Sequence, residues 1–374
     1  MQTTAPGWLV LELTDSPLKL GVVTAASSLP TFFFTLYAGV VADRADKRRI
    51  ILRANVASLA AALALGVLTQ TALVTYPMVL ALAFVLGTAQ AFEIPTRQSF
   101  FVELVGQRDL PNAIALNSMQ FNASRIVGPA IAGWMIGVAG TAACFFANGV
   151  SFVFVIASLL GMRRPPFRAP ERREGTLENI REGLGYIRSV RPVRTLVWVI
   201  AAMSVLGFPY VMLLPVFARD VLHVGARGLG ALLSATGVGA LLGGAALAAA
   251  GGRFGRGRVM MGGALACCAA ILGFAGSRSF PLSLVLLGAV GFTMVLSTAS
   301  ANALLQSVVP DHLRGRVMSV YVFMFVGTSP LGALQAGAVS RWLGAPVALQ
   351  AGAVVLAATL LFAAWRVPEL PNAR

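Results

Sequence analysis

Residues 20–53 read LGVVTAASSLPTFFFTLYAGVVADRADKRRIILR, and this stretch decides the fold. Its first 23 residues, 20–42, carry no charge. At about 1.5 Å per residue they make a helix of about 34 Å, which is enough to cross the ~30 Å hydrocarbon core of a bilayer. Five basic residues follow within 43–53. A long uncharged segment that ends at a basic cluster is typical of a membrane span and its cytoplasmic loop.

The whole chain has the composition of a membrane protein. Of its 374 residues, 57% are apolar and 11% are charged, whereas a soluble domain carries about 25% charged residues. So few charges exclude a set of soluble domains and also a disordered chain. The net charge is +15, but the arginines form short clusters between apolar runs. We therefore assign them to the surface of a lipid bilayer and not to a nucleic-acid partner.

The apolar runs predict a twelve-span pattern in which the first helix is truncated. That first run, Ala5 to Leu13, would make a helix of about 14 Å, which is half of the hydrocarbon core. It is not a signal peptide, because it lacks a basic stretch before it and a small-residue cleavage site after it. Eleven segments are long enough to span completely: 20–42, 51–72, 77–97, 112–138, 142–162, 192–217, 226–250, 257–276, 281–305, 316–340 and 344–366.

The basic residues are distributed unevenly between the two sides that these spans imply. With the short run counted as the first span, the loops after even-numbered spans and the C-terminal tail carry 23 Lys and Arg, and the loops after odd-numbered spans carry 5. Such an excess marks cytoplasmic loops. We therefore expect a multi-pass protein of the cytoplasmic (inner) membrane with its C-terminus in the cytoplasm.

The longest loop divides the chain into two parts. It covers 163–191 and contains the segment 174–188, whose apolar residues fall on one face of a helix. We expect this amphipathic helix to lie at the cytoplasmic surface as a linker. It would join an N-terminal helix bundle, 1–162, to a C-terminal helix bundle, 192–374.

The two parts resemble each other in sequence. Residues 102–133 and residues 305–337 both place a polar turn containing an aspartate before an apolar segment with a proline inside it, Pro129 and Pro330 respectively. A repeated helix bundle is an architecture of secondary transporters.

Two motifs carry a resemblance to a known family. Residues 39–49, GVVADRADKRR, resemble the signature of the major facilitator superfamily between its second and third helices, and residues 125–133, RIVGPAIAG, resemble the fifth-helix motif of its antiporter branch. Residues 42–49 and 95–117 are most similar to the bacterial exporter group that includes enterobactin and macrolide efflux proteins. The resemblance implies an all-α membrane fold of two six-helix bundles and secondary transport, with antiport against protons.

The resemblance also implies roles for the motif residues. A glycine at position 39 would let two helices approach closely. The acidic and basic residues after it would lock a gate on the cytoplasmic face, and the bend at Pro129 would adjust the fifth helix. The residues assigned to this gating machinery are Gly39, Asp43, Arg44, Lys47, Arg48, Arg49, Gly128, Pro129 and Gly133.

Three charged residues fall within or at the end of the apolar runs, where a charge costs about 3 kcal/mol or more and marks a functional hypothesis. Arg125 would face a cavity and pair with an acid or an anionic substrate, or else form a structural ion pair. Glu93 would take up a proton, pair with Arg97 or Arg125, or simply be exposed. Glu12, at the end of the short first run, is a further candidate for a proton.

Polar residues inside spans are candidates for a substrate cavity, although each alone is also typical of a hydrogen bond between helices. They are Gln90, Asn117, Gln120, Tyr210, Asn302, Gln306 and Tyr321. We expect no metal site and no cofactor, because the chain has only two histidines and its three cysteines lie in apolar runs. Nucleotide-binding and hydrolase motifs are absent from the sequence, which argues against an enzyme.

These features favour a secondary active transporter that exports a small amphipathic molecule, of the drug or siderophore type, by alternating access. Its partners would be that molecule, protons and the bilayer, and we expect it to act as a monomer. Two alternatives stay open. One is a membrane protein that does not transport, a sensor, a scaffold or an inactive truncated form, and the other is a nutrient importer of the same fold.

Overall fold

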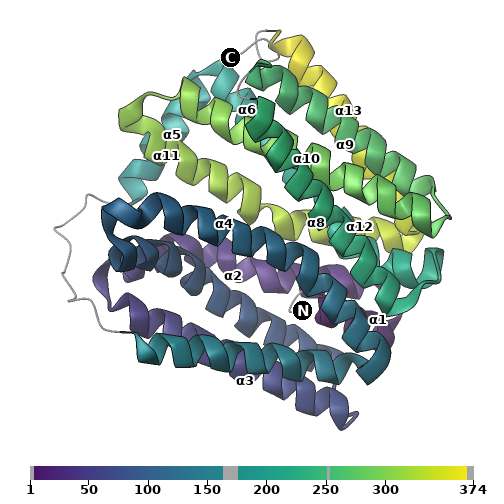
Figure 1. The fold of residues 1–374 in the computed structure, drawn as a ribbon. Helices are drawn as coiled ribbons and strands as arrows, with labels where there is room; N and C mark the ends of the chain where they lie inside the picture. The colour runs from purple at the N-terminus through teal and green to yellow at the C-terminus, as the bar shows by residue number, and fades with distance from the viewer. Residues whose placement is uncertain (1–3, 163–175, 251–252, 369–374) are drawn as a thin grey trace.

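The structure is a computed structural model, which describes residues 4–162, 176–250 and 253–368, apart from the side chains of some residues inside the helices. All the elements of this described part are helical (Figure 1). They are α1 Thr4–Thr14, α2 Pro17–Arg44, α3 Lys47–Gln70, α4 Tyr76–Gly161, α5 Thr176–Ser189, α6 Arg191–Ala202, the π-helical turn η1 Met203–Gly207, α7 Tyr210–Val216, the π-helical turn η2 Phe217–Val221, α8 Gly225–Ala250, α9 Arg256–Gly276, α10 Phe280–Val308, α11 Asp311–Val322, the π-helical turn η3 Phe323–Gly327, α12 Ser329–Leu343 and α13 Ala345–Arg366.

Within the described residues, nine helical runs are long and apolar enough to cross a membrane. They overlap ten of the eleven predicted segments. The segment predicted at 20–42 is not among the nine runs, although it is helical as part of α2. The run Asn112–Gly161 has 50 residues and would measure about 75 Å as one straight helix, far more than one crossing. Gly140 interrupts it with φ at +80°, between the two spans predicted at 112–138 and 142–162. The total of eleven complete spans stays a prediction.

The helices form two groups that are successive in the chain (Figure 1). In the first, which we call the N-terminal group (α1–α4), α4 packs along α3 and α2. In the second, the C-terminal group (α5–α13 with η1–η3), α10 packs along α8 and α9, and α13 packs along α9. The exact bundle boundaries and the linker role of 163–191 stay predictions.

The two groups meet mainly where α4 crosses α8 and where α2 crosses α12. Glycines line both crossings. A Cβ placed on Gly133 of α4 would lie 2.5 Å from the carbonyl oxygen of Ala226 in α8, and a Cβ on Gly21 of α2 would lie 2.6 Å from the carbonyl oxygen of Ala333 in α12. Small residues allow this close backbone approach, which is how helices associate in a bilayer.

The amphipathic segment predicted at 174–188 is helical from Thr176, and the residues before it lie outside the described part. This helix, α5, packs against α11 and α6. Ile187 on its apolar face is buried, and Glu182 forms an ion pair with Arg316 of α11. The helix is therefore docked on the C-terminal group.

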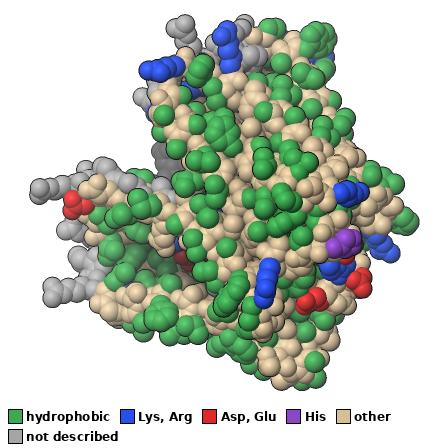
Figure 2. Space-filling model, turned by 45° about the vertical axis from the view of Figure 1, so that its right-hand side comes forward, with side chains coloured by type: hydrophobic (Ala, Val, Ile, Leu, Met, Phe, Trp, Pro, Cys, Tyr) green, Lys and Arg blue, Asp and Glu red, His purple; other side chains and the backbone are tan. Residues whose placement is uncertain are grey.

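The outer surface is largely apolar. Figure 2 shows one face on which hydrophobic side chains predominate, while most of the lysines and arginines drawn lie near its upper and right-hand margins. Tryptophans such as Trp198 and Trp342 are 70% and 80% exposed. A surface of this kind fits lipid, because soluble proteins rarely expose large continuous apolar patches to water.

Candidate functional site

A large cavity lies between the two groups of helices. Its volume is about 1070 Å³, and both groups contribute to its walls: α1 to α4 from one side, and η1, α7 and α12 from the other. Five phenylalanines make much of its apolar lining: Phe100, Phe101, Phe152, Phe154 and Phe208. Its polar lining consists of Thr24, Ser27, Asn55, Ser58, Gln90, Glu93, Arg97, Gln120, Ser158, Ser204 and Ser329.

One ion pair lies in the wall of this cavity. Glu93 and Arg97 are one helical turn apart on α4, and the Arg97 Nε lies 3.1 Å from the Glu93 Oε1. The Glu93 side chain is 21% exposed and the Arg97 side chain 46%. Gln90, one turn earlier, lines the same wall. Among the described residues, the cavity lining therefore contains one carboxylate and one guanidinium, and they neutralise each other.

Arg125 is placed differently from the expected position in a cavity. Its side chain is exposed and lies over the ring of Phe121, with 5.9 Å between the guanidinium carbon and the ring centroid. Among the described side chains, Glu93 pairs with Arg97 and not with Arg125. The backbone next to Arg125 packs on α8, where the Ser234 hydroxyl donates to the carbonyl of Ile126 at 2.6 Å. Because α4 turns its small residues toward α8, the Arg125 side chain lies outside the cavity wall.

Three of the predicted polar residues line a second, more open pocket of about 730 Å³ in the C-terminal group. The Gln306 amide donates to Asn302, and the Tyr321 ring stacks on Phe325 with centroids 6.1 Å apart. Arg256 and Arg314 complete this pocket. Two of the candidates lie elsewhere: Tyr210 is 3% exposed within the core, and Asn117 is exposed and lines neither of these two pockets.

The signature motif lies at the junction of α2 and α3. Gly39, Asp43 and Arg44 are in the last turns of α2, but their side chains lie outside the part of the chain that the structure describes. Lys47 is the first residue of α3. Asp46 caps this helix, since its carboxylate accepts from the backbone N–H of Arg49 at 3.3 Å.

Arg48 binds the end of another helix in the same group. Its Nε donates to the carbonyl of Leu159 at 2.6 Å, and its Nη2 donates to the carbonyl of Leu160 at 2.8 Å. These carbonyls are among the last four of α4, which lack partners within the helix. A cation is favoured there by the helix dipole as well. In this conformation Arg48 thus caps α4, and its contact does not cross to the C-terminal group.

Replacing Arg48 with glutamine is expected to lower the free energy of unfolding by roughly 1–2 kcal/mol, because two charge-assisted hydrogen bonds to helix carbonyls are lost. The measurement is a thermal or denaturant melt of the purified protein in detergent. Arg49→Gln is the matched control, since the Arg49 side chain is 67% exposed and pairs locally with Asp46. Equal stability of the two variants would exclude the capping role.

The fifth-helix motif contributes a packing surface. A Cβ on Gly230 of α8 would lie 2.7 Å from the carbonyl oxygen of Pro129, and Gly133 faces Gly230 across the same crossing. Gly128, by contrast, has open space around the position of a Cβ. Within this motif, close approach therefore depends on Pro129 and Gly133.

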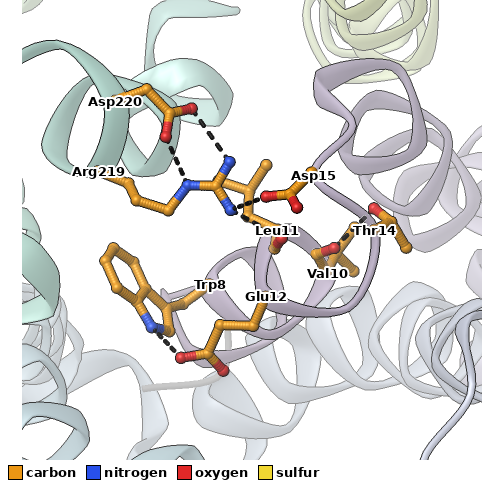
Figure 3. A network of polar contacts seen from close by, with 8 residues as sticks. All are labelled: Trp8, Val10, Leu11, Glu12, Thr14, Asp15, Arg219 and Asp220. Atoms are coloured by element: carbon orange, nitrogen blue, oxygen red, sulfur yellow. Dashed lines mark hydrogen bonds and ion pairs between the residues drawn. The ribbon is translucent and has the colours of Figure 1, made fainter.

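Polar contacts gather where α1 ends (Figure 3). Glu12 accepts from the Trp8 Nε1 at 2.6 Å and from the hydroxyl of Thr141 at 3.2 Å. Arg219 of η2 donates to the carbonyl of Leu11 at 2.8 Å and forms an ion pair with Asp15 at 2.7 Å. Glu12 therefore holds α1 to α4 here, and its carboxylate does not line the large cavity.

Sequence reasoning missed Arg97 as a cavity residue and Asp15 and Arg219 as a contact between groups. Arg97 was named as a possible partner of Glu93 and not as a lining residue, although it follows Glu93 by four residues and so falls on the same helix face. Asp15 and Arg219 are more than 200 positions apart, and no local pattern links them.

Contacts between the groups are concentrated toward the end of the molecule that carries Arg219. In the part of α4 that immediately precedes Arg125, most of the described side chains are exposed. Leu116 and Met119 there are 65% and 68% exposed. On α8, Leu241 and Leu242 are 47% and 57% exposed beyond its crossing with α4. The groups thus join near α1 and α12 (Figure 1) and separate toward the opposite end.

Comparison with known proteins identifies the family of this chain. A family model described as "Transmembrane secretion effector" matches residues 1–373. The "Multidrug efflux pump Tap" of Mycolicibacterium fortuitum is 30% identical over 339 residues, which are 88% of this chain and 82% of that protein. Its counterpart in Mycobacterium tuberculosis is 28% identical over 97% of this chain and 88% of its own length. The "Staphyloferrin A transporter" of Staphylococcus aureus is 23% identical over 87% of this chain and 82% of its own.

Solved structures share the fold. A bacterial homologue of the human lysosomal transporter Spinster, in an inward-facing and unoccupied conformation, superposes with a TM-score of 0.74 at 14% identity, covering 99% of this chain and 94% of that one. A D-xylose–proton symporter superposes with a TM-score of 0.73 at 13% identity, covering 100% and 98%. At such identities the likeness concerns the fold alone.

Proposed function

The chain belongs to the major facilitator superfamily, through its transmembrane secretion effector family, and from this membership we propose that it exports small amphipathic molecules from the cytoplasm. The predicted family and the all-helical membrane fold are confirmed. The family and the fold are those of transporters and not of enzymes. The names of the matched relatives, a multidrug efflux pump and a siderophore transporter, support small-molecule cargo and efflux.

The cavity between the two groups is the observation that carries this proposal. About 1070 Å³ is enough for a drug-sized molecule, since ligand pockets of that kind measure about 300–1,000 Å³. Phenylalanines would hold the apolar part of the cargo, and Gln90, Gln120 and Ser204 would orient its polar part. The second pocket, with Asn302, Gln306 and Tyr321, would extend the path within the C-terminal group.

We assign the separated end of the molecule to the cytoplasm. The basic residues near the starts of α3, α9 and α11, which include Arg48, Arg256 and Arg316, lie toward that end, and an excess of basic residues marks the cytoplasmic side. The structure then corresponds to an inward-facing state, and export requires the groups to rock about the cavity. The bundles 1–162 and 192–374 would be the rocking bodies, with Asp43 and its basic neighbours at the inner gate.

Protons are the proposed driving ion, and Glu93 is the proposed carrier. Since the chain carries no nucleotide-binding motif, an ion gradient is the natural source of free energy. Glu93 is the carboxylate of the cavity wall, and a buried acid in a span is a proton-relay candidate. Arg97, four residues away, would hold the unprotonated form.

Transport by the purified protein in proteoliposomes tests the proposal. With an acidic interior, molecules oriented inside-out should accumulate a labelled amphipathic substrate, and a panel of cationic, neutral and anionic dyes would identify its class. Accumulation with the opposite gradient would favour the nutrient importer. If no member of the panel moves under either gradient or by exchange, the protein does not transport molecules of this class.

A further inference from the structure

We propose that Arg219 is the latch of the outer gate, which holds the two groups together in the inward-facing state and is released in every transport cycle. This inference rests on the proposed orientation and on alternating access, but not on the identity of the cargo. We call Leu11, Asp15, Arg219 and Asp220 the outer clasp (Figure 3).

The guanidinium of Arg219 is held from both sides of the boundary between the groups. Its Nη1 contacts the Asp15 Oδ1 at 2.7 Å and the carbonyl oxygen of Leu11 at 2.8 Å, both in the N-terminal group. Its Nε and Nη2 donate to the two carboxylate oxygens of Asp220, in the C-terminal group, at 2.6 Å and 3.1 Å. Asp220 therefore orients the planar guanidinium of Arg219, and the remaining nitrogen, Nη1, contacts the N-terminal group.

The N-terminal partners are built to receive a cation. Leu11 belongs to the last turn of α1, whose carbonyls carry the negative end of the helix dipole. Asp15 follows directly and adopts φ of +46°, in the left-handed region that aspartate tolerates better than most residues. Its own N–H donates to the same Leu11 carbonyl at 3.0 Å. The turn thus places a carboxylate and a helix carbonyl side by side.

The Asp15–Arg219 ion pair joins the N-terminal group to the C-terminal group. The pairs Asp46–Arg49 and Glu93–Arg97 lie inside the first group, and Glu182–Arg316 lies inside the second. The nearby carboxylate of Glu12 is bound within its own group, by Trp8 and Thr141.

The clasp and the glycine crossings have different roles. At the crossings, backbones touch through van der Waals contacts, which favour closure but are short-ranged. The clasp adds a directional, charged contact at the rim, where the Asp15 side chain is 84% exposed and the Arg219 side chain 26%. Water can therefore replace this charged contact when the outer gate opens. The outer clasp thus favours the inward-facing state over the outward-facing one without making it irreversible.

The test measures the accessibility of the cavity from each side. Cys144, Cys267 and Cys268 are buried and can be replaced by alanine, after which a Ser27→Cys reporter in the cavity wall is labelled with a membrane-impermeant maleimide. An Arg278→Cys reporter in an exposed outer loop should label from outside and checks the orientation. The variants are Arg219→Gln, Arg219→Lys, Asp15→Asn and the matched control Arg278→Gln.

Arg219→Gln should raise the ratio of outside to inside labelling at position 27 by about threefold to tenfold, as expected for a partly exposed charged contact. Arg219→Lys keeps the positive charge but loses the two parallel hydrogen bonds of the guanidinium to Asp220. Asp15→Asn keeps the contact between Arg219 and the Leu11 carbonyl. Both variants should therefore shift the labelling ratio by an intermediate amount. Arg278→Gln should leave the ratio unchanged. If Arg219→Gln fails to fold, the two milder variants decide the question.

An unchanged labelling ratio in folded variants would overturn the proposal. A parallel loss of labelling from both sides would do the same, because it would show a purely structural role. The readout needs no substrate, so it remains decisive even if the export assay fails.

Discussion

Replacing Glu93 with glutamine is expected to reduce proton-driven accumulation to the level of protein-free vesicles while leaving substrate exchange intact. Glutamine keeps the shape of the side chain and can still bind Arg97 through its carbonyl oxygen, but it cannot carry a proton. The cavity wall contains no second carboxylate among the described residues.

The expected mechanism follows from the position of the Glu93–Arg97 pair. When Glu93 is ionised, its pair with Arg97 at 3.1 Å is neutral overall, so this part of the cavity wall carries no net charge. Protonation leaves Arg97 without its partner, and the cavity acquires a positive charge in a weakly polar surrounding, where an unpaired charge is costly. That cost couples the proton to a change in the conformation or in the occupancy of the cavity.

Two assays on the same proteoliposomes separate coupling from binding: uptake driven by a pH gradient, and counterflow without a gradient. Glu182→Gln is the matched control, because it makes the same chemical change in a carboxylate that lies on α5 and pairs with Arg316, away from the cavity. Normal gradient-driven uptake by Glu93→Gln would falsify the coupling role, and Glu12 would then be the next carboxylate to test.

Replacing Gly133 with leucine is expected to abolish transport by preventing closure of the outer gate. A Cβ at this position would lie 2.5 Å from the Ala226 carbonyl oxygen and 2.8 Å from the Gly230 Cα, and backbone atoms cannot move aside as a flexible side chain can. Overpacking typically costs about 1–3 kcal/mol. Alternating access requires the two groups to separate at this end in the outward-open state, so this cost would shift the population toward that state by roughly fivefold to a hundredfold.

Gly128→Leu is the matched control, since Gly128 lies five residues away in the same motif and has open space around its Cβ position. It should leave transport within about twofold of the parent protein. The same labelling of the Ser27→Cys reporter would show the expected opening in Gly133→Leu. If both leucine variants transport equally well, the α4–α8 crossing is not the moving contact.

The sequence predicted the class of the protein well, since the features that determine it are local. Uncharged runs and basic clusters can be counted along the chain, and they predicted a helical membrane protein. The short motifs at 39–49 and 125–133 supplied the resemblance to a transporter family, which the comparisons confirm. The signal at Glu93 was equally local, because a carboxylate inside an apolar run stands out. The sequence left open whether Glu93 would take up a proton, pair with Arg97 or Arg125, or be exposed, and the structure places Arg97 beside it.

The predicted positions that differ from the structure depend on the rotation of helices. Arg125 and Tyr210 were both candidates for the cavity, with a structural ion pair and a hydrogen bond between helices as the respective alternatives. In the structure, Arg125 is exposed beside Phe121 and Tyr210 is buried in the core. In a membrane helix that is apolar all round, the hydrophobic pattern does not specify which face turns inward. Small residues at the crossings decide this rotation, and their partners lie in distant helices.

The sequence by itself determined that this chain crosses the membrane many times and which loops gather the positive charge, because burial in lipid acts on each segment separately. Only the tertiary structure decided which polar residues share the cavity and which end of the molecule is closed. The physical reason is that Gly133 meets Gly230, and Asp15 meets Arg219, only after the two groups have packed together. Contacts of this kind join residues far apart in the chain, and no local pattern contains them.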